Sequence, residues 1–165
     1  IGYRGPLQPG GDLPRLKLDL TIDEILVLNP VVRDVHHPYS DCPDDGIQIK
    51  CYCFEEVFAE KLRALAERER PRDLYDVVLL YRHEKLRAMK DIILSTLEKK
   101  CAFKNIPVPT MDTLRNRPER EELEAEWANM LAHQMTSLPA FELFWIEISQ
   151  VMDWLGGGRN EEKGE

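Results

Sequence analysis

The chain has 165 residues, of which 43% are hydrophobic and 32% charged, and its formal net charge is −8. This length favours one domain with its own core over two. No apolar run approaches the roughly 18 to 20 residues that a membrane span needs. The negative charge argues against nucleic-acid binding over the whole surface, although it leaves room for a local basic patch. The first residues lack the basic start and apolar core of a signal peptide, so we expect a cytoplasmic protein.

The first fifty residues predict short strands and turns. Residues 1–21 favour two strands joined by a hairpin, because Pro9-Gly10-Gly11-Asp12 is a turn signal and residues 16–20 alternate between leucine and charged residues. The alternation places Lys17 and Asp19 on one face of a strand. Residues 22–46 predict a long surface connection with a short strand around Leu26, and residues 46–52 predict another strand. Because the sequence opens without methionine, as if inside a strand, we expect it to be the later part of a longer domain.

The cysteines allow two interpretations. The chain contains four, which are Cys42, Cys51, Cys53 and Cys101. The first three, together with His36 and His37, suggest zinc, but the spacing matches none of the usual paired ligand patterns. We therefore favour reduced, partly buried thiols. Cys53 also precedes a predicted helix as its N-cap, and Glu56, three residues on, supplies half of a capping box.

Residues 54–81 predict two successive helices around which the rest of the chain is organised. The first has an apolar stripe at helical spacing, formed by Phe54, Val57, Phe58, Leu62 and Leu65. Lys61 falls inside this stripe, where a charge is costly unless an anion accepts it. The second helix starts at Pro71 and carries Asp73 and Asp76 on one face. These residues predict a functional site or a buried ion pair. Alternatively, Lys61 extends to the surface, Asp73 caps its helix and Asp76 pairs with Lys61.

A basic cluster accompanies these helices. Between residues 61 and 72 the chain has two acids, Glu67 and Glu69, and five bases: Lys61, Arg63, Arg68, Arg70 and Arg72. Such a cluster is either a solvated helix end or the rim of a phosphate-binding site.

Beyond Tyr81 the sequence predicts only helices and a linker. Residues 84–100, 118–134 and 139–155 carry large apolar residues at steps of three and four, which indicates amphipathic helices packed on a core. Residues 105–117 contain Pro107 and Pro109 and predict a linker with a short helical turn. Three glycines, residues 156–158, end the last helix, and the polar residues 157–165 are expected to be disordered.

Several motifs follow one another along the chain. They are Tyr3-Arg4-Gly5-Pro6, Lys17-Leu18-Asp19-Leu20, Ala59-Glu60-Lys61-Leu62-Arg63-Ala64-Leu65 after Glu55-Glu56, and Arg70-Pro71-Arg72-Asp73-Leu74-Tyr75-Asp76. In this order and spacing they resemble the AbiEii/AbiGii toxin family of nucleotidyltransferases, which act as the toxin half of type IV toxin–antitoxin or phage-abortive-infection pairs. Residues 138–145 are similar to the family's C-terminal helix.

The resemblance implies an α+β fold. Residues 1–82 would form part of a polymerase-β-like nucleotidyltransferase core, with a small mixed or antiparallel sheet, and residues 83–156 a helical C-terminal region. The implied activity is transfer of a nucleotide from an NTP to an acceptor such as tRNA. Mg²⁺ is the implied cofactor, and a cognate antitoxin is the implied partner.

The resemblance also implies roles for individual residues. Asp19 corresponds to the metal-binding carboxylate on the sheet, and Lys61, with Arg72, to the nucleotide-binding groups. Asp73 or Asp76 corresponds to the catalytic aspartate on the helix, and spacing from Lys61 favours Asp76. Nucleotidyl transfer needs acids that hold magnesium, a cation beside the leaving phosphates, and an acid near the attacking hydroxyl.

The sequence departs from the family in one respect. The family's Gly-Ser turn followed by Asp-x-Asp is not among the 165 residues, and Asp19 alone is too few carboxylates for two magnesium ions. We therefore expect this chain by itself to transfer no radiolabel from NTPs to total tRNA. Two other interpretations stay open: a non-catalytic helical module that binds RNA or protein, and a scaffold in which Lys61 forms a buried ion pair.

Overall fold

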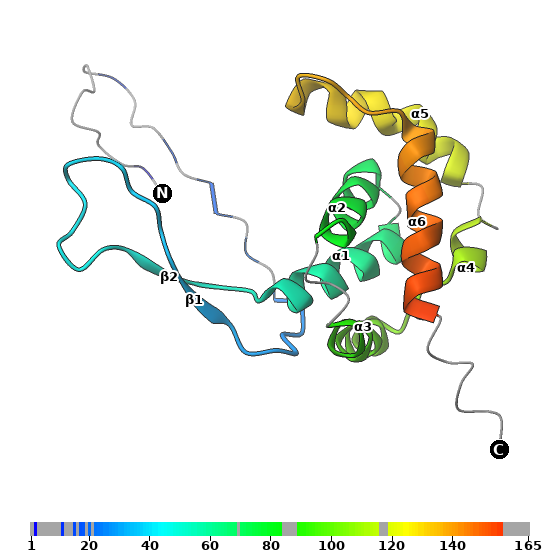
Figure 1. Ribbon diagram of the computed structural model, residues 1–165, viewed down its shortest axis with the longest axis horizontal. Helices are drawn as coiled ribbons and strands as arrows, with labels where there is room; N and C mark the ends of the chain where they lie inside the picture. Colours follow the sequence, from blue (N-terminus) through cyan, green and yellow to red (C-terminus); the bar gives the residue numbers. More distant parts are fainter. Residues whose placement is uncertain are drawn as a thin grey trace.

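The computed structural model describes residues 2, 11, 15, 17, 18, 20, 22–68, 70–83, 89–115 and 119–156. A two-stranded hairpin projects from a group of helices (Figure 1). The elements are β1 (Val31–Asp34), β2 (Gln48–Cys51), α1 (Phe54–Arg68), α2 (Pro71–Tyr81), α3 (Lys90–Lys104), α4 (Met111–Arg115), α5 (Glu119–Leu131), the 3₁₀ helix η2 (Ala132–Gln134) and α6 (Phe141–Gly156). This arrangement agrees with the predicted α+β class. No helix in the described ranges is both long and apolar enough to cross a membrane.

The sheet of the described residues consists of β1 and β2. They pair antiparallel, with Val31 opposite Cys51 and Asp34 opposite Gln48. β2 confirms the predicted strand within residues 46–52. Gly46 precedes it with a φ of 70°, a left-handed conformation that glycine adopts without steric cost.

The predicted strand around Leu26 is wrong, because residues 22–30 contain no strand. The backbone N–H groups of Val27 and Leu28 donate instead to the carboxylate of Glu56, at 3.1 and 2.9 Å. Of the predicted N-terminal hairpin, the described residues include one antiparallel bridge, between Gly2 and Arg15. Asp19 and the predicted tail, residues 157–165, lie outside the described residues.

The helices share one apolar core. α1 packs against α2 and α3, and α2 also packs against α5 and α6 (Figure 1). In the predicted stripe of the first helix, Phe58, Leu62 and Leu65 are buried in the core and Phe54 packs against it, whereas Val57 is only half-buried. The predicted stripe of residues 139–155 is confirmed as core-facing. Fully buried members of the core include Phe58, Leu62, Leu74, Val77, Ile93, Leu97, Leu131, Val151 and Ile148. Burial of these side chains would stabilise the fold by about 1.5–3 kcal/mol each.

Some helix boundaries differ from those predicted. α3 begins at Lys90, with Met89 as its N-cap, rather than at the predicted Glu84, and it continues to Lys104. Residues 84–88 lie outside the described residues. Asn105 is the C-cap of α3, with a left-handed φ of 54°. Asparagine is one of the residues that tolerate this conformation at a helix C-terminus. α4 confirms the short helical turn predicted within the linker of residues 105–117. The helix predicted over 118–134 divides into α5 and η2.

An aromatic cluster joins α2, α5 and α6. The Phe144 ring on α6 stacks on Tyr75 of α2 with 5.1 Å between centroids, and lies 5.2 Å from Trp127 of α5. The Arg82 guanidinium lies 4.8 Å from the centroid of Phe144 and donates to Glu147 at 2.6 and 2.8 Å. The cluster therefore fixes α5 relative to α2.

Candidate functional site

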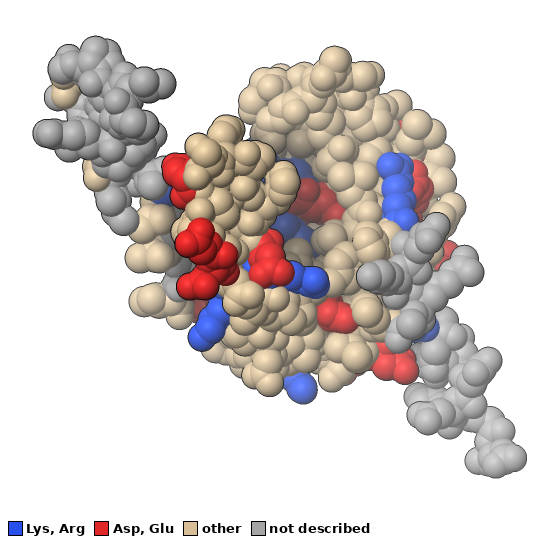
Figure 2. All heavy atoms as spheres, turned by 60° about the vertical axis from the view of Figure 1, so that its left-hand side comes forward, with Lys and Arg blue, Asp and Glu red and all other residues tan. Residues whose placement is uncertain are grey.

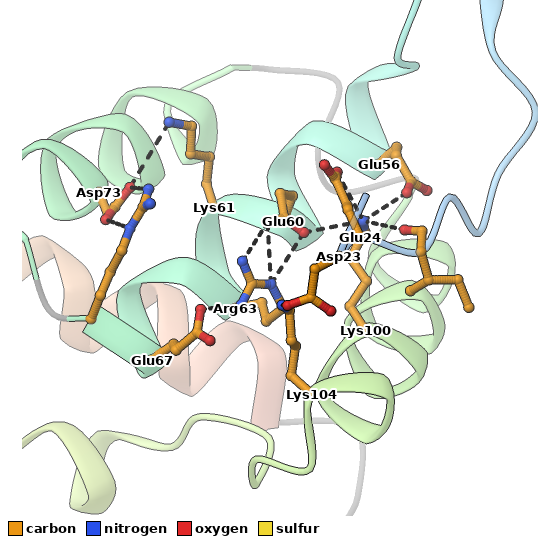
Figure 3. Close-up of polar contacts among 12 residues, drawn as sticks. Asp23, Glu24, Glu56, Glu60, Lys61, Arg63, Glu67, Asp73, Lys100 and Lys104 are labelled. Carbon is orange, nitrogen blue, oxygen red and sulfur yellow. Dashed lines mark hydrogen bonds and ion pairs between the residues drawn. The ribbon is translucent and has the colours of Figure 1, made fainter. Parts of the chain in front are cut away.

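Lys61 connects α1 to α2. Its Nζ lies 2.6 Å from Oδ2 of Asp76 and 3.9 Å from Oδ1 of Asp73, and Figure 3 shows it extending toward the helix that carries Asp73. The side chains of Lys61 and Asp76 are 29% and 31% exposed. The predicted burial of Lys61 and Asp76 is thus only partial, because a lysine stem can lie along the apolar face while its ammonium reaches the rim.

Asp73 is the buried acid of the site, with 1% of its side chain exposed. Arg68, at the end of α1, donates to both of its carboxylate oxygens, from Nε at 2.7 Å and Nη2 at 2.8 Å. This bidentate pair raises the pKa of Arg68 above its ordinary value. Asp73 lies in the first turn of α2, where the helix dipole favours a negative charge. The structure therefore brings Lys61, Asp73 and Asp76 together, and Asp73 binds Arg68 rather than capping its own helix.

A pocket of about 400 Å³ opens beside Asp73. Its lining residues are Arg68, Arg70, Arg72, Asp73, Asn129, Met130 and His133, contributed by the α1–α2 turn and by α5 with η2. Arg70 and Arg72 are exposed, and within the described residues neither has an ion-pair partner. The predicted basic cluster thus places three arginines on the wall of one pocket. Elsewhere charges are mixed: Figure 2 shows acidic and basic side chains together in a central hollow of the face that it presents.

A second charged cluster, which the sequence analysis missed, lies between α1 and α3 (Figure 3). The side chain of Lys100 is 1% exposed, and its Nζ lies 2.8 Å from Glu56 and 3.1 Å from Glu60. It also donates to the carbonyl oxygen of Ile25 at 2.9 Å. Glu56 is equally buried, so this ammonium has replaced its water shell with protein oxygens.

The buried cluster corrects the prediction for Glu56. Its carboxylate binds Lys100 and the amides of Val27 and Leu28, instead of completing a capping box at Cys53. A signal for Lys100 was present, since it lies seven residues after Ile93 on the buried face of α3. Like Lys61, Lys100 is a lysine within an apolar helical stripe.

Glu60 links this cluster to Arg63, which donates to it from Nε and Nη2 and also pairs with Glu67. Burial acts to raise the pKa of Glu60, but the hydrogen bonds and charges of Arg63 and Lys100 lower it overall. For Lys100 burial acts to lower the pKa, and Glu56 and Glu60 raise it overall.

These shifts predict how stability depends on pH. Glu60 has a lower pKa in the folded chain, so its ionised form contributes stability above about pH 4.3, the ordinary glutamate value, and this contribution is lost on further acidification. Lys100 has a raised pKa, so its contribution is full below about pH 10.4 and is lost at higher pH. Between pH 3 and 6, Glu60→Gln should flatten the pH dependence of the free energy of unfolding measured in urea. Glu98→Gln, on the exposed face of α3, is the control; equal slopes in both variants would contradict the assignment.

The cysteines are free thiols, and Cys101 is buried. Burial raises the pKa of Cys101 to about 11. The described residues contain no group of three or more His, Cys, Asp or Glu side chains placed to hold a metal ion. Neither the zinc alternative nor a magnesium site is therefore seen in that part of the chain.

Comparison with known proteins bears on these motifs. A family model described as "Nucleotidyl transferase AbiEii toxin, Type IV TA system" matches residues 2–153. The chain belongs to this family. No curated protein and no solved structure matches it. In this AbiEii-family chain the match includes both helices of the Lys61 site. It confirms the resemblance inferred from the motifs. Because a type IV system pairs a toxin with an antitoxin, the family implies an antitoxin partner.

Proposed function

We propose that this chain carries the phosphate-binding and acceptor-activating groups of a nucleotidyltransferase toxin, which transfers a nucleotide from an NTP to an acceptor such as tRNA. The main support is the convergence of Lys61 with Asp73 and Asp76, across two helices that match the family. An ion pair that served only to fill the core would have no reason to keep its ammonium partly accessible at the rim.

Lys61 is the nucleotide-binding cation in this proposal, with Arg72 nearby in sequence as a second one. The ammonium of Lys61 is held at 2.6 Å by Asp76 and is still 29% exposed, so it is placed in advance and can meet a polyphosphate without unfolding. Cations aimed at the phosphate oxygens stabilise the charge that develops in phosphoryl and nucleotidyl transfer. Holding the cation in place beforehand avoids reorganisation during the reaction.

The two aspartates have different settings and suit different tasks. Asp76 is half-buried and reachable, so its carboxylate can orient the acceptor hydroxyl or accept its proton. Asp73 is buried and holds Arg68 in a bidentate pair, so it fixes the positions of Arg68 and Lys61. We therefore propose Asp76 as the group that touches the acceptor and Asp73 as a positioning residue.

Magnesium is the cofactor that the family resemblance implies, and it would supply positive charge beside the phosphates. Asp19 is the carboxylate that the family resemblance assigns to it, on the proposed polymerase-β-like sheet. The Gly-Ser and Asp-x-Asp motif is not among these 165 residues, and one carboxylate is too few for the usual pair of ions. We therefore predict that this chain alone transfers no nucleotide to an acceptor.

The Lys61→Met variant tests the proposal. The charged hydrogen bonds of a lysine to phosphate contribute about 1.5–3 kcal/mol, so NTP affinity should fall at least about tenfold. The fold should survive, because a partly exposed ion pair contributes only about 0–1 kcal/mol and Asp73 keeps Arg68. Calorimetric titration with ATP, CTP, GTP and UTP in the presence of Mg²⁺ measures the affinity.

Lys50→Met on the exposed face of β2 removes the same charge away from the site and should leave NTP affinity unchanged. If Lys61→Met binds NTPs as the wild type does, the pair is part of a scaffold and the proposed function is wrong.

A further inference from the structure

We propose that the pocket beside Asp73 is a nucleoside-phosphate site in which Asn129, Met130 and His133 contact the base. This inference deepens the proposed function by adding α5 and η2 to the site. None of these three residues has a role in the proposed function. The inference rests on the composition and position of the pocket wall. The nucleotide bound there is either the incoming NTP or the terminal nucleotide of an RNA acceptor.

One side of the pocket suits a phosphate. Three of its seven lining residues are arginines, and Asp73 is the single acid. Asp73 already binds Arg68 at both oxygens, whereas Arg70 and Arg72 have no ion-pair partner among the described residues. Guanidinium groups bind phosphate through two parallel hydrogen bonds, so a pair without partners on one wall suits that ligand.

The lining residues from α5 and η2 suit a base. Asn129 and His133 are four residues apart across the end of α5 and η2, and both are exposed. An amide can hydrogen-bond the edge of a base, and an imidazole can stack on its face. Met130, between them, is half-buried and adds an apolar surface. The Nε2 of His133 lies 3.2 Å from the amide nitrogen of Gln134, which also donates to the Met130 carbonyl oxygen at 3.2 Å.

The size and position of the pocket fit the same ligand. Its volume of about 400 Å³ lies in the range of roughly 300–1,000 Å³ that is usual for small-molecule sites. Asp73 belongs to the wall of the pocket and also lies 3.9 Å from Nζ of Lys61. A nucleotide in the pocket would therefore lie next to the cation that the proposed function assigns to the triphosphate.

The double variant Asn129→Ala/His133→Ala tests the inference. Both side chains are exposed and alanine favours helix, so the variant should fold. The probes are ATP, CTP, GTP and UTP with Mg²⁺, and a fluorescein-labelled single-stranded RNA of about 12 nucleotides, enough to cover a typical single-strand site. Loss of two base contacts should weaken binding of NTP or RNA about tenfold and change the preference among bases.

The matched control is Asn29→Ala/His36→Ala, which removes the same two side-chain types from exposed positions around β1. Weakened NTP binding would place the incoming nucleotide in the pocket, and weakened RNA binding would place the acceptor there. A second variant, Arg70→Ala/Arg72→Ala, should weaken binding of the same probe, NTP or RNA, by an equal factor for every base.

Unchanged affinities and base preferences in the α5 double variant, or no binding of any probe by the wild-type chain, would overturn the inference. The result is separable from the test of the proposed function, because Lys61 is intact in these variants. Loss of binding in the α5 variant together with normal binding in Lys61→Met would leave the pocket in place and reject the proposed role of Lys61.

Discussion

Replacement of Lys100 by methionine is expected to lower the free energy of unfolding by about 3–5 kcal/mol. The ammonium is fully buried between Glu56 and Glu60 and also binds the Ile25 carbonyl oxygen. Methionine keeps most of the stem volume but leaves two carboxylates without their shared cation, and an uncompensated buried charge is costly. The segment before β1 should loosen as well, since it depends on the same contacts.

Urea unfolding of Lys100→Met against Lys99→Met measures this effect. Lys99 is the preceding residue on α3 and is exposed, so its replacement should change stability by less than about 0.5 kcal/mol. A double-mutant cycle with Glu56→Gln should show a coupling energy of about 0.5–3 kcal/mol. Additive effects, or equal stability of the two lysine variants, would contradict the role given to the cluster.

Replacement of Phe144 by alanine is expected to lower the free energy of unfolding by a similar amount, about 3–5 kcal/mol. The ring is buried, stacks on Tyr75 and contacts Trp127, and the Arg82 guanidinium lies 4.8 Å from its centroid. The substitution would leave a cavity where three helices meet. It would lose the contacts among them as well as the transfer free energy of the ring.

Thermal and urea unfolding, followed by tryptophan fluorescence, measure this loss. The matched control is Leu143→Ala, because Leu143 is the preceding residue on α6 and its side chain is 57% exposed. The control should stay within about 0.5 kcal/mol of the wild type. If Phe144→Ala proved as mild as its neighbour, α6 would not be fixed by this aromatic cluster.

Local patterns predicted the elements that carry the site. The stripe of α1, the proline at the start of α2 and the position of Lys61 within the stripe were all readable at helical spacing. They correctly predicted that Lys61 would meet an aspartate of the next helix, because the two helices are consecutive. The exposed fraction of Lys61 was not readable, since it depends on how a flexible stem lies against α2.

Contacts between distant parts of the chain could not be predicted. Lys100 binds the carbonyl oxygen of Ile25, 75 residues earlier, and Glu56 binds amides 28 and 29 residues earlier. These bonds use backbone groups, which leave no residue-type pattern. The same bonds explain why a strand was wrongly expected around Leu26. β1 was missed because four residues after a proline are too short to show a period of two.

The pocket wall illustrates another limit of the sequence. Asn129 and His133 are exposed polar residues on a helix, which is the ordinary composition of a solvated face. Their position in the same pocket as Arg70 and Arg72 follows only from the packing of α5 against α2.

The contact of Glu56 with Val27 and Leu28 gives α1 a second role, because the helix then holds these two residues at a fixed distance from Lys61. Glu56 and Lys61 are five residues apart on one helix, so the anchoring point of the incoming chain and the ammonium are separated by about 7.5 Å along the axis. One added residue between them would rotate Glu56 relative to Lys61 by about 100°, so the two side chains could no longer meet Val27 and Asp76 at the same time. The length of that stretch of helix therefore sets the position of Val27 and Leu28 relative to the ammonium of Lys61.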